Sequence, residues 1–192
     1  IRHDMRHHIQ LVYALIHDDR KEEALWALES YDTQLDKTAV RPYSLNPYIN
    51  AILSVYMNRA QEEGFSTSTE VNFPEAAPVL EEQLSVVLAN LLENGIRVTS
   101  REPKDKQFLR VQLQTKGKQA ILSVENYCSS PIDFDKDGFP RTTREGHGIG
   151  MVSVRKFIEQ YKGYKDFTQT DGTVKFIIYF RMDVPKGCER EN

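Results

Sequence analysis

A histidine and an aspartate stand side by side near the beginning of the chain. They are His3 and Asp4, in the motif IRHDMRHHI at residues 1–9. An imidazole on the exposed side of a helix can act as a nucleophile, and a neighbouring carboxylate can accept its proton and fix its tautomer. The motif therefore predicts a nucleophilic histidine. The alternative is a solvated surface pair, which is the usual state of adjacent histidine and acid side chains on a polar helix face.

Two asparagines and an arginine recur in a second segment, LANLLENGIR at residues 88–97. Asn90, Asn94 and Arg97 follow one another at four- and three-residue spacing, which places them along one edge of an apolar helix. Amide oxygens can bind Mg²⁺, and a guanidinium can pair with phosphate. The spacing indicates a site for a nucleoside triphosphate. The alternative is that these residues cap the helix or line its rim, with their hydrogen bonds satisfied by the protein.

Three glycines alternate in EGHGIGMVSV at residues 145–154, directly ahead of a predicted helix. Gly146, Gly148 and Gly150 would leave backbone N–H groups free and let a phosphate approach the positive end of that helix. The motif does not follow a strand and lacks the lysine of a P-loop. It therefore supports neither a dinucleotide-binding fold nor a Walker site. A plain flexible hinge is the alternative.

An acidic segment imitates the start of a calcium-binding loop. Asp133, Asp135, Asp137 and Gly138 satisfy the opening of an EF-hand, but Arg144 occupies the position where a bidentate glutamate is required. A cation at that position repels calcium, and a proline interrupts the segment. We therefore expect an acidic loop and no calcium site.

The spacing of apolar residues predicts the elements that must position these side chains. Three- and four-residue spacing indicates helices, and alternation indicates strands. The expected helices cover residues 1–18, 24–37, 48–63, 81–98 and 149–161. The expected strands cover residues 65–73, 108–115, 119–126, 164–169 and 173–182, with a long polar loop over 127–148. We expect an α+β chain with a helical domain at 1–64 and a mixed α/β domain at 65–192.

Composition excludes several classes of protein. The 192 residues are 40% hydrophobic and 28% charged with a net charge of −3, which argues against a disordered tail and a strongly basic nucleic-acid binder. Cys128 and Cys188 are too few for a disulfide scaffold, so both are expected to be thiols in a reducing cytosolic setting. The apolar runs fall short of the roughly 20 residues that span a bilayer. A start at Ile1 rather than Met is expected of a soluble piece of a longer protein.

Taken together and in this order, the three motifs resemble the catalytic core of a sensor histidine kinase. The resemblance covers nearly the whole chain and is strongest to the quorum-sensing peptide-receptor kinases, which have an Arg-His-Asp phosphoacceptor motif. It implies a helical hairpin that dimerises into a four-helix bundle carrying the phosphohistidine. It also implies an α/β sandwich that binds ATP, of the superfamily shared by gyrase, heat-shock chaperone, kinase and MutL, abbreviated GHKL.

The resemblance assigns roles to the first two motifs. His3 would be the phosphorylated nucleophile and Asp4 its general base. Asn90 and Asn94 match the family's asparagine box. Asn94 would be the Mg²⁺ ligand, Asn90 would help order the metal site and Arg97 would contact the phosphates.

The resemblance also extends to the second half of the chain. Asn126 stands where the family usually has an aspartate that accepts a hydrogen bond from the adenine amino group, and the usual glycines after it are missing. An amide oxygen can still accept that bond. The glycine box beside the triphosphate is matched by Gly146, His147, Gly148 and Gly150. The lid and the residue whose hydroxyl faces the purine are matched by Thr142-Thr143-Arg144 and by Thr173.

The implied function is autophosphorylation of His3 from Mg-ATP, followed by transfer to an aspartate of a response regulator receiver domain. The implied cofactors are ATP and Mg²⁺. The implied partners are a second copy of the chain and that receiver domain, with an upstream membrane sensor domain in the full-length protein and no nucleic acid. The chain would be the cytoplasmic portion of a membrane-anchored kinase. Two alternatives stay open: a phosphorelay histidine phosphotransferase with a degenerate ATP domain, and a non-catalytic dimerising module.

Overall fold

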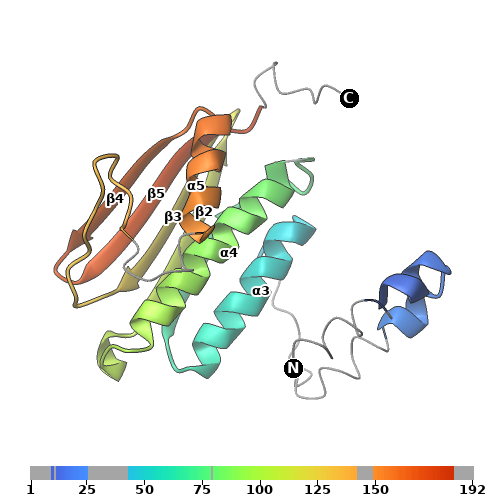
Figure 1. Cartoon of the computed structure of the whole chain (residues 1–192), viewed down its shortest axis with the longest axis horizontal. Helices are drawn as coiled ribbons and strands as arrows, with labels where there is room; N and C mark the ends of the chain where they lie inside the picture. The colour runs from blue at the N-terminus through green and yellow to red at the C-terminus, as the bar shows by residue number, and fades with distance from the viewer. Residues whose placement is uncertain (1–9, 11, 26–42, 79, 142–148, 184–192) are drawn as a thin grey trace. The chain divides into compact units, whose positions relative to one another are not determined.

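The computed structural model describes residues 10, 12–25, 43–78, 80–141 and 149–183 (Figure 1). It divides the chain into two compact units, Ile1–Val40 and Arg41–Asn192. In the first unit, residues 12–17 are helical, as the apolar spacing predicts, and a second helical stretch covers residues 21–25. His3 and Asp4 lie outside the described residues.

The second unit contains all the elements expected beyond residue 47. Its helices are α3 (Pro47–Glu62), α4 (Leu80–Thr99) and α5 (Ile149–Gln160), with a short 3₁₀ turn at Lys104–Lys106. Its strands are β1 (Ser66–Asn72), β2 (Phe108–Lys116), β3 (Gln119–Tyr127), β4 (Tyr164–Thr170) and β5 (Thr173–Arg181). The predicted α+β class is therefore confirmed, with element boundaries close to those expected.

The strands form one five-stranded sheet in the order β1-β2-β3-β5-β4. The β1–β2 pair is parallel and the other pairs are antiparallel. All three helices lie on the same face of this sheet, with α4 between α3 and α5 (Figure 1). Because α4 packs on the sheet and on both other helices, it is the central element of the unit.

The core forms where α4 meets the sheet. Apolar residues recur along α4 at three- and four-residue spacing, and these side chains are fully or almost fully buried: Leu84, Leu88, Leu91, Leu92 and Ile96. From the sheet they meet the inward side chains of β2 and β3: Leu109, Val111, Leu113, Leu122 and Val124. The edge of α4 that carries Asn94 and Arg97 is thus fixed by a packed core on its other side.

Helix α3 lies within the sheet-containing compact unit, which begins at Arg41, and the domain boundary expected near Gly64 stays a prediction. The fully buried Asn46 caps α3, because its Oδ1 accepts hydrogen bonds from the N–H groups of Tyr48 and Ile49, both at 3.1 Å. Its Nδ2 donates to Glu81 Oε2 at 2.7 Å, on the first turn of α4. The amide of Asn46 thus joins the first turn of α3 to the first turn of α4.

Two tight hairpins connect neighbouring strands. Lys116 pairs with Gln119 across a two-residue loop in which Gly117 has φ +59°. At the second hairpin Asp171 and Gly172 have φ values of +50° and +77°, as the expected Asp-Gly turn requires. In the part of the chain that the structure describes, no helix is long and apolar enough to cross a membrane.

Candidate functional site

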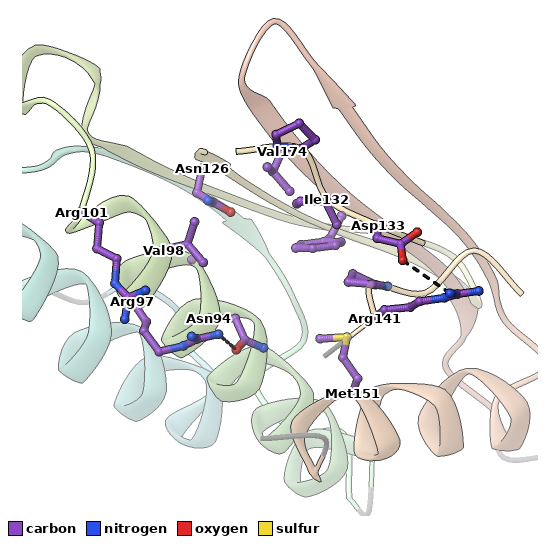
Figure 2. Close-up of a pocket in the computed structure, with 14 residues that line it drawn as sticks. Asn94, Arg97, Val98, Arg101, Asn126, Ile132, Asp133, Arg141, Met151 and Val174 are labelled. Atoms are coloured by element: carbon purple, nitrogen blue, oxygen red, sulfur yellow. Dashed lines mark hydrogen bonds and ion pairs between the residues drawn. The ribbon is translucent and has the colours of Figure 1, made fainter. Parts of the chain in front are cut away.

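A cavity of about 380 Å³ opens between α4, the loop that follows β3, the first turn of α5 and the strand β5 (Figure 2). Its lining combines polar and charged groups on α4 with an apolar floor. The lining residues are Asn94, Gly95, Arg97, Val98, Arg101, Asn126, Pro131, Ile132, Asp133, Pro140, Arg141, Met151, Val174 and Phe176. Such a mixture is typical of a small-molecule site, in which apolar walls bury the ligand and a few polar groups orient it.

The charged edge of the cavity comes mainly from α4. Asn94 and Arg97 lie side by side, with Arg97 Nη2 donating to Asn94 Oδ1 at 3.3 Å (Figure 2). Arg101 lies in the turn just beyond the end of α4. Among the described residues, the lining holds three arginines and one carboxylate, Asp133, which is paired with Arg141 at 3.5 Å. This excess of positive charge suits an anionic ligand such as a phosphate chain.

Asn126 presents a hydrogen-bond acceptor from the end of β3, and its neighbours fix which way the amide is turned. Thr99 Oγ1 donates to the Tyr127 carbonyl oxygen at 2.7 Å, so the Thr99 oxygen is available as an acceptor. Asn126 Nδ2 donates both to Thr99 Oγ1 and to the Tyr127 carbonyl oxygen, each at 3.2 Å. The amide oxygen is therefore the end directed into the cavity (Figure 2).

Asn90 and Gly150 form a close contact beside the cavity. A Cβ atom on Gly150 would lie 3.0 Å from Asn90 Oδ1 and 3.3 Å from Asn90 Cγ. The absence of a side chain at residue 150 therefore lets the start of α5 approach α4. The structure brings these two predicted site residues together, although the cavity lining includes neither.

Other predicted site residues have different outcomes. Thr173 begins β5 and pairs with Tyr127, whereas the described cavity lining contains Val174 and Phe176 from the same strand. Because side chains alternate along a strand, Thr173 lies on the other face of the sheet from these two residues, so the expected approach of its hydroxyl to the cavity is not observed. The following predicted residues lie outside the described part of the chain: Thr142, Thr143, Arg144, Gly146, His147 and Gly148.

The acidic segment of the loop is held by arginines. Arg155 on α5 pairs with both Asp135 and Asp137 at 2.9 Å, and its guanidinium lies 4.0 Å from the centroid of the Phe139 ring. The Asp135 carboxylate also accepts the N–H groups of Phe139 and Asp137, both at 2.9 Å. The backbone hydrogen bond from Phe139, followed by that from Asp137 and the charge of Arg155, holds the pKa of Asp135 below its usual value. These carboxylates stabilise the loop.

Cys128, at the start of the same loop, has the properties of a structural thiol. It is buried, and its Sγ donates to the Ser130 carbonyl oxygen at 3.2 Å. Burial raises the pKa of this thiol, which favours the uncharged and unreactive form. The expectation of a plain thiol at Cys128 is consistent with this environment, whereas Cys188 lies outside the described residues.

A metal ion in this cavity would need additional oxygen atoms from the molecule bound there. Among the described residues, no group of three or more His, Cys, Asp or Glu side chains is placed to hold a metal. Asn94 Oδ1 is a neutral oxygen whose 3.3 Å contact with Arg97 is a long hydrogen bond. Mg²⁺ commonly takes few protein ligands and completes its octahedron with phosphate oxygens and water, so this donor set fits a nucleotide-bound Mg²⁺.

Comparison with known proteins identifies the sheet-containing unit. The GHKL domain model matches residues 81–181. The chain is 24% identical over 198 residues to the sensor histidine kinase CitA of Klebsiella pneumoniae. That alignment covers 96% of this chain and 35% of CitA, so the chain spans about a third of the length of that relative.

Solved histidine kinase structures share the fold. The catalytic domain of histidine kinase ThkA superposes with a TM-score of 0.55 at 19% identity, covering 70% of this chain and 92% of that one. The histidine kinase domain of the blue-light-activated kinase EL346 from Erythrobacter litoralis gives a TM-score of 0.56 at 13% identity, covering 71% of this chain and 64% of that one.

The resemblance to sensor histidine kinases is thus confirmed for family and fold, and the narrower likeness to the quorum-sensing peptide receptors stays a prediction. Within the matched range, Asn94 and Arg97 of α4 meet Asn126 of β3 at one cavity. The chain belongs to the GHKL domain family and has the fold of a histidine kinase catalytic domain.

Proposed function

We propose that this chain is the catalytic core of a sensor histidine kinase that phosphorylates His3 from Mg-ATP. The observation that carries the proposal is the cavity, which combines an arginine-rich edge with the amide oxygens of Asn94 and Asn126. The GHKL match and the 24% identity to CitA support it. The phosphoryl group would pass to an aspartate of a response regulator receiver domain, and a second copy of the chain would complete the dimer. The core would be the cytoplasmic portion of a membrane-anchored protein.

The residues of the cavity divide the work of holding the nucleotide. Asn126 Oδ1 accepts a hydrogen bond from the exocyclic amino group of adenine, because its Nδ2 is already occupied within the protein. Val98, Ile132 and Val174 provide apolar contacts for the base. Arg97 pairs with phosphate oxygens and thereby releases Asn94 Oδ1 for the metal. Mg²⁺, when bound, neutralises charge on the phosphate chain.

The chemical step is an in-line transfer of the γ-phosphoryl group. A ring nitrogen of His3 forms a bond to the γ-phosphorus, the bond from that phosphorus to the bridging oxygen breaks, and ADP leaves with its electron pair. The imidazole proton passes to Asp4. Since His3 belongs to the first compact unit and the cavity to the second, the nucleotide must be brought to the histidine within one chain or across the dimer.

Incorporation of γ-labelled phosphate tests the proposal. Wild-type protein with Mg-ATP should acquire acid-labile, base-stable label, and His3→Gln should remove the label while leaving ATP binding unchanged. Label that persists in His3→Gln would refute the role of that histidine. ATP binding without label would favour the phosphotransferase reading or the non-catalytic module, and absence of ATP binding would refute the assignment of the cavity.

A further inference from the structure

We propose that Gln169 is a positioning residue for the nucleotide cavity, acting through the segment 128–132 that leads from β3 into the cavity wall. This inference rests on the proposed function, since it concerns the affinity of the same cavity for nucleotide. Gln169 lies on β4, the edge strand, and the described cavity lining does not include it. Its effect must therefore pass through the residues that it holds.

The side-chain amide of Gln169 makes three hydrogen bonds to the backbone of this segment. Its Nε2 donates to the carbonyl oxygens of Cys128 at 2.8 Å and Ser130 at 2.9 Å. Its Oε1 accepts the N–H of Ile132 at 2.9 Å. All three distances are in the range of good N–H···O hydrogen bonds. A primary amide is suited to this task because it offers two donors and an acceptor from one planar group.

The segment needs such support because the sheet ends before it. The last backbone hydrogen bond that ties it to β5 and its turn runs from Cys128 N–H to the Gly172 carbonyl oxygen at 2.8 Å. Glu102 then holds Ser129 through the backbone N–H and the hydroxyl, both at 3.0 Å. Gln169 holds the next turn of the chain. The backbone of this segment is therefore held by side chains that reach it from other elements.

The position of Gln169 in the sheet connects it directly to the cavity. Gln169 pairs with Val174 on β5, and Val174 lines the cavity. Paired residues in adjacent strands share a face, so Gln169 lies on the helix-covered side of the sheet. From there it fixes Ile132, which lines the cavity together with Val174 (Figure 2). Removing the amide would release one wall and leave Asn94, Arg97 and Asn126 in place.

The expected result is a change in affinity without a matching change in the chemical step. Gln169→Met keeps the length of the side chain and removes all three hydrogen bonds. It should raise the KM for Mg-ATP about tenfold and leave kcat for His3 labelling within about twofold. Gln169→Glu keeps the acceptor for Ile132 N–H but directs a carboxylate oxygen at two carbonyl oxygens, so it should also raise KM. Thr168→Ala, at the exposed neighbouring position, is the control and should change neither parameter.

Hydrogen exchange of the Ile132 amide gives a second readout that needs no nucleotide. Exchange should be faster in Gln169→Met than in Thr168→Ala, while amides in the middle of β3 stay protected in both. Faster exchange with an unchanged KM would overturn the positioning role. A fall in kcat as large as the rise in KM would overturn it too. If Gln169→Met fails to fold, the KM comparison is made with Gln169→Glu, which keeps the acceptor for Ile132 N–H and loses the two donated hydrogen bonds. Wild-type protein that does not bind ATP would refute the proposed function, whereas unchanged Ile132 exchange in the variant would refute the proposed role of Gln169 alone.

Discussion

The two walls of the cavity are built in different ways. On one side, Asn94 and Arg97 project from α4, whose other side contributes fully buried leucines to the core. On the other side, Ile132 and Asp133 belong to a loop that is held by hydrogen bonds and ion pairs to side chains. Displacing the first wall disrupts a row of fully buried leucines, whereas displacing the second breaks polar contacts and the packing of partly buried side chains such as Ile132. The wall that would carry the phosphate chemistry is thus the more rigid of the two.

This difference predicts how the two walls respond to mutation. Openings that break few apolar contacts cost less free energy than openings of the core. Substitutions in the loop wall should therefore alter nucleotide affinity with little effect on global stability. Substitutions at the polar edge of α4 should abolish phosphoryl transfer. The helix backbone there is held by the core, so such a substitution removes the functional group and leaves the fold intact.

The largest effect is expected for Asn94→Ala. Loss of the amide oxygen removes the proposed metal ligand, so the rate of His3 labelling should fall by about a hundredfold or more. The free energy of unfolding should change by less than about 1 kcal/mol, since within the described part of the chain the side chain makes one long hydrogen bond, to Arg97. Asn58→Ala, on α3, is the matched control. A labelling rate within threefold of wild type would remove Asn94 from the chemistry.

A second substitution tests whether the neighbours of Asn126 require an amide at this position. Asn126→Asp restores the residue usual in the family, but both hydrogens of the Asn126 amide point at oxygens, those of Thr99 and Tyr127. A carboxylate would face the Tyr127 carbonyl without a donor, so the free energy of unfolding at neutral pH should fall by about 1–2 kcal/mol. Urea unfolding measures it, with the exposed Asn72→Asp as control for the added charge. Equal stability of the two variants would show that Thr99 and Tyr127 do not select an amide.

Arg155→Gln tests the loop wall at its outer end. Arg155 holds Asp135 and Asp137, but these groups are between about a third and a half exposed. Ion pairs of this kind contribute less than about 1 kcal/mol to stability. We expect ATP affinity to fall by about threefold to fivefold. This loss should become smaller as salt is added. Lys156→Gln removes the same charge from the adjacent exposed position and should leave affinity unchanged. A large drop in melting temperature would contradict the view that this wall is only loosely coupled to the core.

Acid should produce the smallest effect on nucleotide affinity, and this effect should come from Asp135 in the loop wall. The pKa of Asp135 is lowered by the N–H of Phe139, then by that of Asp137 and by Arg155. A lowered pKa means that the contribution of Asp135 is complete above the usual aspartate value of about 3.9 and is lost as the pH falls through the lower value in the folded protein. The affinity difference between wild type and Arg155→Gln should therefore be constant from pH 5 to 7 and diminish below about pH 4. If the affinity difference already changes near pH 6, the titrating group would be one other than Asp135.

Periodicity predicted one wall of the cavity and missed the other for a physical reason. Asn94 and Arg97 recur at helical spacing within a single element, so the sequence alone places them together. Gln169 and Ile132 are held together by a contact between residues 37 positions apart, and a polar residue in an alternating strand carries no sign of such a contact. Thr173 was assigned to the cavity by resemblance alone, and the pleat of β5 places it on the other face.

The cap at Asn46 has a mechanical consequence. Asn46 lies near the start of the second unit, which begins at Arg41, and its amide joins the first turns of α3 and α4 through Glu81. A pull or a torque on the incoming chain is therefore applied to the base of α4 before it reaches any strand. Further along, Arg59 joins α3 to Glu93 of α4 at 2.9 Å, next in sequence to Asn94. The two helices are thus joined near both ends, by Asn46 and Glu81 at one end and by Arg59 and Glu93 next to Asn94 at the other.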